Sequence, residues 1–334
     1  MHLNSDKRLR EWLECCCGMR HGCPMRIATT LILVLLSFQS LAYSTANHKR
    51  ITTAAADLIR RCELPLPLSA QQLDQLVDLN LGQDGVLKKM RLWHFPAPPK
   101  DSGNPAPQKQ RAWLYGKLVT QTTFDRWVSY LDDQIRQQAD FAQRLPGIGA
   151  LLHYVQDLAV PAHAVPIFHP TRIANADKLD SWKNLQPEAK SLLPATAATC
   201  TTIRDGDLDS VGNFLSQLRN LTLNSLQQPL GPGCQGKNCR WSRYWSQRVL
   251  ADGFAEYGCD GKDVFGKRRF SCAGEKYIVK AQVYKVFAAA RFQDAVIGSA
   301  QALFYYSRLP AAAGAAQPQW LPNKKLLQGL QGSY

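Results

Sequence analysis

The segment "LLHYVQDLAVPAHAVPIFH", residues 151–169, constrains the fold more than any other part of this chain. It holds three of the seven histidines and one aspartate among mostly apolar side chains. If the part before Pro161 is a helix, His153 and Asp157 are four residues apart and share one face. Because their neighbours are apolar, these polar groups are expected to be buried and to need partners. The segment therefore predicts a metal site, with His163 just beyond the helix end.

Apolar residues recur at helical spacing along most of the chain, and the alternation typical of strands is scarce. Ser69 and Gln72 predict a capping box at the start of a helix, and Pro146 with Gly147 is expected to end another. The expected helical stretches are residues 50–62, about 110–144 as one helix or a pair, 208–227, 240–258 and 275–308. We therefore predict an all-α class, built as a single multi-helix domain.

The N-terminal region has the layout of a secretory signal peptide. A basic, cysteine-bearing stretch precedes the apolar run "IATTLILVLLSF", which is short for a membrane span, and the small-residue site "SLAYSTAN". Cleavage after Ala42 is the simplest interpretation and cleavage after Ala46 is the alternative; an uncleaved membrane anchor is the competing hypothesis. We predict a secreted or periplasmic protein with a leader and signal peptide (1–42), a helical domain (43–309) and a flexible C-terminal tail (310–334).

Six of the ten cysteines lie outside the leader: Cys62, Cys200, Cys234, Cys239, Cys259 and Cys272. In an exported chain they predict up to three disulfides, with fifteen possible pairings. The last four could instead form a thiolate zinc site. An oxidising compartment favours the disulfides.

The formal net charge is +14 at pH 7. Such an excess favours an anionic partner, such as nucleic acid or a phospholipid surface, and does not choose between them. A generally basic secreted protein is the alternative. Trp241, Tyr244 and Trp245 in "CRWSRYWSQR" could contact a membrane interface, stack on bases, or pack on the core as part of one amphipathic helix.

The stretch "HYVQDLAVPAH" resembles the His-x-x-x-Asp-x(5)-His signature of the zinc-dependent phospholipase C and single-strand-specific zinc nuclease superfamily. The resemblance covers residues 43 to about 308. It implies a secreted, nearly all-helical domain whose cleft holds two or three zinc ions.

The resemblance also implies a set of ligands. In that superfamily the mature N-terminal residue binds zinc together with a nearby histidine, which points to Tyr43 and His48. An aspartate followed by a His-Phe pair points to Asp84 and His94, with Asp78 as the competing carboxylate. One zinc would be held by Asp84, His94, His153 and Asp157, and Asp157 would bridge to a second zinc held by Tyr43 and His48.

The third ligand set departs from the superfamily pattern. Members usually supply another histidine after the counterpart of His163, with a Glu or Asp four residues further on. This chain has no histidine after His169. His169 is therefore expected to join His163 at the third ion, with Asp180 as the favoured carboxylate and Asp177 as the alternative.

The resemblance implies hydrolysis of a phosphate ester by a zinc-activated water, with Asp84 orienting or deprotonating the nucleophile. "HYVQD" is closer to the phospholipase form of the signature, so the expected activity is a phospholipase C acting on phospholipid headgroup phosphate esters. A single-strand-preferring zinc nuclease or 3′-nucleotidase is the alternative, and a non-catalytic secreted helical binding protein is a further one. The expected partners are a phospholipid or nucleic-acid phosphodiester, with peripheral membrane contact and no protein partner.

Overall fold

The computed structural model describes residues 44–84, 111–114, 117–120, 123–165, 167, 169, 177–180, 182, 194–206, 208–249 and 255–312. All of these belong to one compact unit of the chain, Gln39–Tyr334. The predicted leader (1–42) and most of the predicted tail (310–334) lie outside the described residues. Among the helices described, none combines the length and the hydropathy that a membrane crossing requires.

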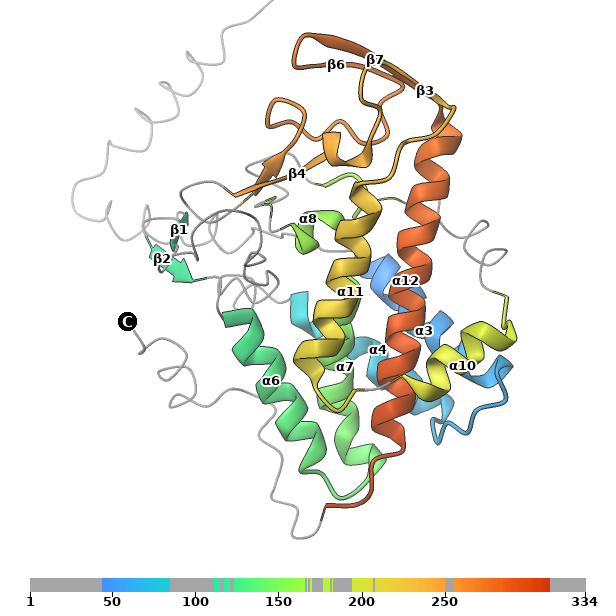
Figure 1. The fold of residues 1–334 in the computed structure, drawn as a ribbon. Helices are drawn as coiled ribbons and strands as arrows, with labels where there is room; N and C mark the ends of the chain where they lie inside the picture. The colour runs from blue at the N-terminus through green and yellow to red at the C-terminus, as the bar shows by residue number, and fades with distance from the viewer. Residues whose placement is uncertain are drawn as a thin grey trace, which may run out of the picture. The chain divides into compact units, whose positions relative to one another are not determined.

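Helices dominate the described part of the chain (Figure 1). The α-helices are α3 (Thr45–Arg61), α4 (Ala70–Leu81), α6 (Thr123–Arg136), α7 (Phe141–Asp157), α8 (Pro161–Ala164), α10 (Ala197–Asp205), α11 (Val211–Leu226) and α12 (Ala281–Ser307). Two 3₁₀ turns are present as well, η1 (Gly82–Asp84) and η2 (Trp241–Arg243).

Within the described ranges, three small antiparallel sheets accompany the helices, in the orders β1-β2, β3-β7-β6 and β4-β5. Their strands are β1 (Arg111–Leu114), β2 (Lys117–Thr120), β3 (Cys234–Gln235), β4 (Trp245–Val249), β5 (Ala255–Tyr257), β6 (Arg269–Cys272) and β7 (Glu275–Val279). The predicted all-α class is therefore confirmed only in part. The protein is mainly helical, and the sheets correct the prediction.

The local signals for helices at 50–62, 69–72 and 208–227 are confirmed. They correspond to α3, to the start of α4 and to α11. The capping box is complete: the backbone N–H of Gln72 donates to Ser69 Oγ (3.2 Å), and that of Ser69 donates to Gln72 Oε1 (2.9 Å). These signals succeed because a cap and its first turn interact only over three or four residues.

The strands fall where helices were predicted. The described residues of 240–258 form η2, β4 and β5, the start of 275–308 forms β7, and the described residues near the start of 110–144 form the paired strands β1 and β2. In such short stretches, periodicity cannot separate a strand from a turn of helix, and tertiary contacts decide. At the turn between β6 and β7, Ala273 and Gly274 both have positive φ, 50° and 76°, as tight two-residue hairpin turns require.

Pro146 lies inside α7 rather than at a helix end, which corrects the prediction made from it. The helix begins one turn earlier, where the Asp140 side chain accepts a hydrogen bond from the backbone N–H of Gln143 (2.9 Å). From Arg144 to Asp157 every residue except Pro146 is buried. Burial on all sides outweighs the one backbone hydrogen bond that a proline removes.

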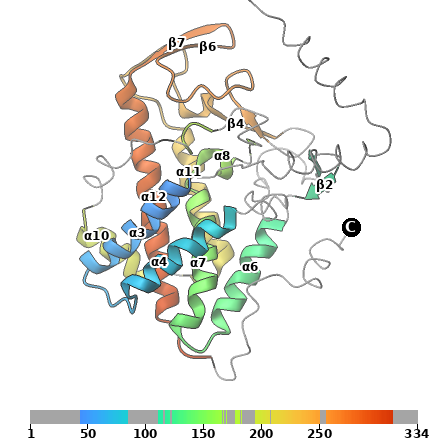
Figure 2. The same cartoon turned by 180° about the vertical axis from the view of Figure 1, so that it is seen from behind.

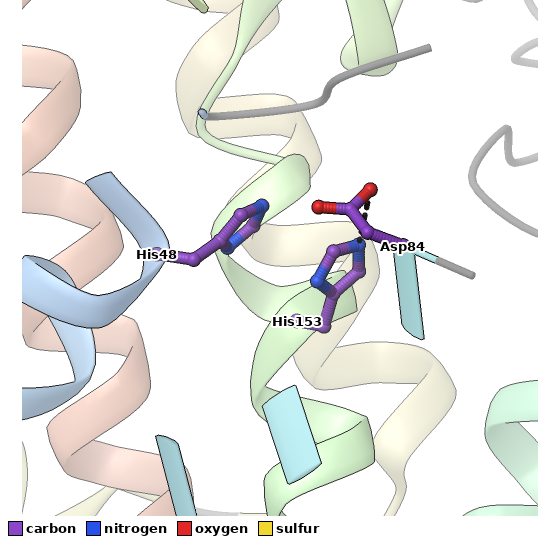
Figure 3. Close-up of side chains that lie close together, drawn as sticks. All are labelled: His48, Asp84 and His153. Atoms are coloured by element: carbon purple, nitrogen blue, oxygen red, sulfur yellow. Dashed lines mark ion pairs between the residues drawn. The ribbon is translucent and has the colours of Figure 1, made fainter. Parts of the chain in front are cut away.

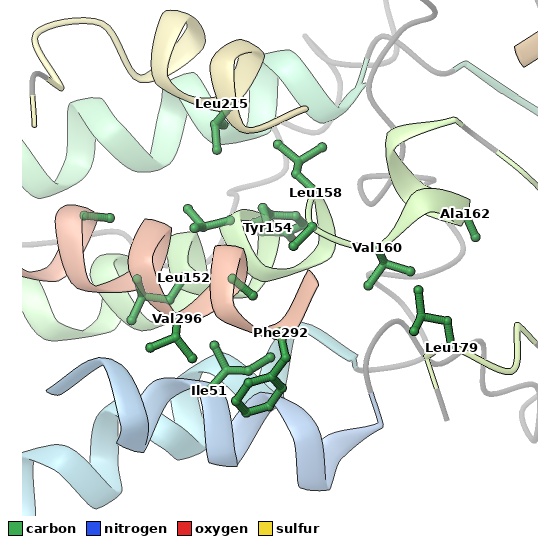
Figure 4. Packing of buried hydrophobic residues seen from close by; sticks show 14 of the residues in the cluster. Ile51, Leu152, Tyr154, Leu158, Val160, Ala162, Leu179, Leu215, Phe292 and Val296 are labelled. Carbon is green, nitrogen blue, oxygen red and sulfur yellow. The ribbon is translucent and has the colours of Figure 1, made fainter. Parts of the chain in front are cut away.

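The core is centred on α7 and α12. Helix α7 packs against α4, α6 and α12, and α12 also packs against α3 and α10 (Figure 2). Ile51 of α3, Leu152 of α7 and Val296 of α12 are fully buried and meet where these helices converge (Figure 4). Three helices that are distant in the sequence are thereby fixed against one another.

The six cysteines outside the leader form three pairs at bonding distance: Cys62–Cys200, Cys234–Cys239 and Cys259–Cys272. The disulfide prediction is thus supported, and the thiolate zinc site is wrong. The first pair links the end of α3 to α10 across 138 residues. Three such pairs fit an oxidising, extracytoplasmic setting.

The aromatic residues of "CRWSRYWSQR" pack on the core. Trp241, Tyr244 and Trp245 are 5 %, 1 % and 0 % exposed. The Trp241 ring stacks on Phe287 with 3.9 Å between centroids, and Phe265 contacts all three. Of the three alternatives, packing on the core is confirmed, although the segment forms η2 and β4 rather than one helix. Contact with a membrane or with bases is wrong, because a buried ring cannot reach either partner.

Candidate metal centre

Seven of the nine predicted metal ligands are described, and they converge in the interior. None of their side chains is more than 7 % exposed. They are His48 on α3, Asp84 on η1, His153 and Asp157 on α7, His163 on α8, and His169 and Asp180 further along the chain. Tyr43 and His94 lie outside the described residues.

The first group consists of His48, Asp84 and His153, whose candidate ligand atoms lie within 4.8 Å of one another (Figure 3). The imidazole rings of His48 and His153 stack with 4.2 Å between centroids. Nε2 of His153 is 4.0 Å from Oδ1 of Asp84. Because η1 follows directly on α4, the packing of α4 against α7 brings Asp84 to His153.

Asp157 lies between the two groups of histidines. Its Oδ1 is 3.5 Å from Nε2 of His48, and its Oδ2 is 3.5 Å from Nε2 of His153. The same Oδ2 is 3.8 Å from Nδ1 of His163. The one-turn spacing predicted for His153 and Asp157 is confirmed on α7, and this carboxylate faces histidines of both groups.

The second group consists of His163, His169 and Asp180. Oδ2 of Asp180 is 3.1 Å from Nε2 of His169 and 3.8 Å from Nε2 of His163. Pro161 begins the short helix α8 that carries His163, as the fixed φ of proline suits a first helical position. The chain thus turns sharply after α7, and His163 returns to Asp157.

Asp177, the alternative carboxylate, accepts hydrogen bonds from other parts of the protein. Its Oδ2 accepts hydrogen bonds from Trp245 Nε1 (2.8 Å) and the Tyr257 hydroxyl (3.2 Å). Its Oδ1 accepts the backbone N–H groups of Leu179 (2.9 Å) and Asp180 (3.2 Å). Burial, followed by the nearby charge of Asp180, raises the pKa of Asp177 to about 7. Asp177 therefore shapes the turn that presents Asp180.

Asp180 is the carboxylate that faces the histidines of the second group. Burial acts to raise its pKa, but the adjacent imidazoles of His163 and His169 outweigh burial and lower the pKa. At the first group, the corresponding choice lay between Asp84 and Asp78. Asp78 is exposed on α4, whereas Asp84 lies beside His153.

Three of the histidines direct Nδ1 toward a carbonyl oxygen. His48 Nδ1 lies 2.6 Å from Gln156 Oε1, and His169 Nδ1 lies 2.6 Å from the backbone oxygen of Ile167. His153 Nδ1 makes a longer contact of 3.4 Å with Asn80 Oδ1. A neutral imidazole that donates through Nδ1 keeps its lone pair on Nε2. In each of these histidines Nε2 is the nitrogen that faces a carboxylate.

The donor set fits a metal ion. Ligands about 2.1 Å from a tetrahedral zinc ion are about 3.4 Å from one another, and the contacts of His48 and His153 with Asp157 are 3.5 Å. Oδ1 of Asp180 is buried and makes no hydrogen bond within the described part of the chain, which is costly for a carboxylate oxygen without another partner. Two buried groups of His and Asp side chains can therefore hold metal ions.

Sequence reasoning did not single out Thr52, Asn80, Gln156 and Ser299, the residues that support these ligands. For the first three, the sequence did contain a signal: Thr52 follows His48 by four residues, Asn80 precedes Asp84 by four, and Gln156 directly precedes Asp157. Each lies within one turn of a ligand and is buried. A buried polar residue one turn from a ligand is thus a usable signal for a supporting role.

No protein-family model matches the chain. Searches of curated proteins and of solved structures also find no match. The geometry of the two groups therefore carries the functional argument.

Proposed function

We propose that this protein is a secreted zinc-dependent phosphoric ester hydrolase, with phospholipid headgroup phosphate esters as its substrate class. One observation carries the proposal: seven His and Asp side chains from distant parts of the chain converge in an apolar core, in two groups that share Asp157. Mixed nitrogen and oxygen ligands at these separations suit zinc. Several zinc ions in one site are typical of enzymes that hydrolyse phosphate esters.

Each residue has a role in this proposal. His48, Asp84 and His153 bind metal in the first group, and His163, His169 and Asp180 bind it in the second, with Asp157 between them. When bound, the zinc ions supply Lewis acidity that activates water and offsets charge on the phosphoryl oxygens. Asp84, the most accessible of the seven side chains, orients the attacking water and accepts its proton.

The position of Ser44 supports a role for a processed N-terminus. Its backbone N–H donates to the carbonyl oxygen of Asp180 (3.0 Å), and the Asn47 side chain donates to the same oxygen (3.2 Å). The start of α3 is therefore attached to the segment that presents Asp180. Cleavage after Ala42 would create an α-amino group at Tyr43, one residue from this attachment, as the superfamily resemblance requires.

The phospholipase activity is favoured by "HYVQD", in which Gln156 stands where the nuclease form of the signature commonly has glycine. The positive net charge suits an anionic substrate of either class. Burial of Trp241 and its neighbours removes both the base-stacking surface of the nuclease alternative and the membrane-contact surface of the phospholipase, so these rings favour neither substrate. Convergence of His169 with Asp180 weakens the non-catalytic alternative, which rested on an incomplete third ligand set.

The test begins with metal analysis of the purified mature protein, which should contain two or three zinc equivalents. The same preparation is then assayed for release of phosphocholine from phosphatidylcholine vesicles and for digestion of single-stranded DNA. The proposal expects the first activity. DNA digestion alone would replace phospholipase with nuclease, and a folded protein that binds no metal would overturn both.

Two pairs of variants connect activity to the site. Asp157→Asn should abolish hydrolysis, because it weakens a carboxylate shared by both groups. Asp84→Asn should lower the turnover number, whereas Asp78→Asn is the matched control on the exposed face of α4 and should behave like the natural protein. Full activity in Asp157→Asn would show that the site is assigned wrongly.

A further inference from the structure

The side-chain amide of Gln156 lies directly beneath His48 in the core. Gln156 is fully buried, and its Oε1 accepts a hydrogen bond from His48 Nδ1 at 2.6 Å. Its Nε2 donates to the hydroxyl oxygens of Thr52 (3.0 Å) and Ser299 (3.2 Å). The amide nitrogen thus donates to two hydroxyl groups, one from α3 and one from α12, and the amide oxygen faces the imidazole of His48.

Asn80 repeats this arrangement beneath His153. It is also fully buried, and its Nδ2 donates to Gln156 Oε1 (3.2 Å) and to Thr52 Oγ1 (3.3 Å). Its Oδ1 lies 3.4 Å from His153 Nδ1. The two amides are therefore joined to each other. Gln156 Oε1 accepts from both His48 and Asn80, so the orientation of one amide constrains the other.

We infer that Asn80 and Gln156 are positioning residues that hold His48 and His153 in the Nδ1–H tautomer, so that Nε2 is the metal-binding nitrogen. The inference rests on the proposed metal site and specifies how the protein prepares it. Both amides act through the far side of an imidazole ring, where a carbonyl acceptor fixes the ring orientation and makes Nε2 a better donor.

The linked amides also explain why both histidines are prepared together. The rings stack at 4.2 Å, and both Nε2 atoms lie 3.5 Å from Asp157. If Gln156 reversed its amide, a nitrogen would face His48 Nδ1, and that histidine would have to carry its proton on Nε2. The same reversal would place two amide nitrogens against each other, which disfavours it. The network therefore selects one state for the pair.

The test compares zinc dissociation constants of the mature protein and its variants by competition with a chromophoric chelator. Gln156→Met fills a similar volume without an acceptor and should weaken zinc binding by about 10- to 100-fold. Gln156→Glu keeps the acceptor, while the Thr52 and Ser299 hydroxyls can donate to its second oxygen. Its zinc affinity should fall by less than about tenfold relative to the natural protein.

Gln138→Met is the matched control. Gln138 is also a buried amide (1 % exposed) that donates to a carbonyl oxygen, at 2.9 Å from Gln134, but it lies beyond the opposite end of α7 from Asp157. It should lose stability without losing zinc affinity. Equal loss of affinity in both Met variants, or none in Gln156→Met, would overturn the inference.

A second measurement uses only the natural protein, so it does not depend on whether a variant folds. In the zinc-loaded natural protein labelled with ¹⁵N-histidine, NMR should show His48 and His153 protonated at Nδ1 and metal-bound at Nε2, with His169 as an internal reference. Metal bound through Nδ1 at either residue would overturn the inference. If the protein binds zinc but cleaves neither substrate, only the proposed function fails; if it cleaves substrate and the NMR tautomer is the opposite, only this inference fails.

Discussion

Gly149→Ala is the substitution that most directly tests how α4 and α7 assemble the first metal group. Gly149 lies on α7, one turn before His153. A Cβ at this position would be 2.7 Å from Leu79 Cβ and 3.0 Å from the backbone oxygen of Leu76, whereas ordinary contacts begin at 3.4 Å. Both opposing atoms are held close to the backbone of α4. The clash can therefore be relieved only if α4 moves away from α7.

The expected cost follows from two opposing effects. Overpacking a tight contact typically costs about 1–3 kcal/mol, while replacing glycine by alanine in a helix stabilises it by up to about 1 kcal/mol. Gly212→Ala on α11 is a control for the second effect, because its new Cβ would approach only Ser210 Oγ, at 3.8 Å. The difference between the two variants should therefore equal the overpacking cost, about 1–3 kcal/mol.

Thermal unfolding of the metal-free protein measures this difference. For a domain of this size, 1 kcal/mol corresponds to roughly 2–4 °C in Tm, so Gly149→Ala should unfold well below Gly212→Ala. Zinc affinity should also fall in Gly149→Ala alone, because α4 carries Asn80 and leads into Asp84. Equal unfolding temperatures and equal zinc affinities in the two variants would refute the argument that this crossing sets the site.

Other contacts support three shorter predictions. Replacing Cys62 and Cys200 with serine should cost about 2–5 kcal/mol of unfolding free energy, because their bond closes a long loop; chemical denaturation checks this, and an unchanged midpoint would contradict it. Tyr154→Phe removes a hydroxyl that donates to Gln83 Oε1 (3.3 Å) beside Asp84, so denaturation should show a loss of about 1–2 kcal/mol and a lower zinc affinity. Trp241→Ala should cost about 3–5 kcal/mol, and a stable variant with weakened vesicle binding would instead restore a surface role for this ring.

Local interactions explain the features that could be predicted from the sequence. The spacing of His153 and Asp157, the capping box at Ser69 and the helix of residues 50–62 each depend on contacts within one or two helical turns. Helix geometry puts positions four apart on one face whatever the rest of the chain does. The apolar neighbours of His153 also indicated burial, and hence a need for partners, before any tertiary contact was known.

Tertiary structure alone decided which distant residues share a site. His48 and Asp84 meet the α7 ligands only because α3 and α4 pack against α7, and Asp180 meets His163 and His169 only in the folded chain. Pairwise spacing in the sequence contains no such information. Packing also buried Trp241, and residues expected to be helical formed strands. Asp180 rather than Asp177 faces the histidines, because Asp177 accepts hydrogen bonds from Trp245 and Tyr257 instead. Burial and long-range hydrogen bonding are properties of the assembled core, so these outcomes required the fold.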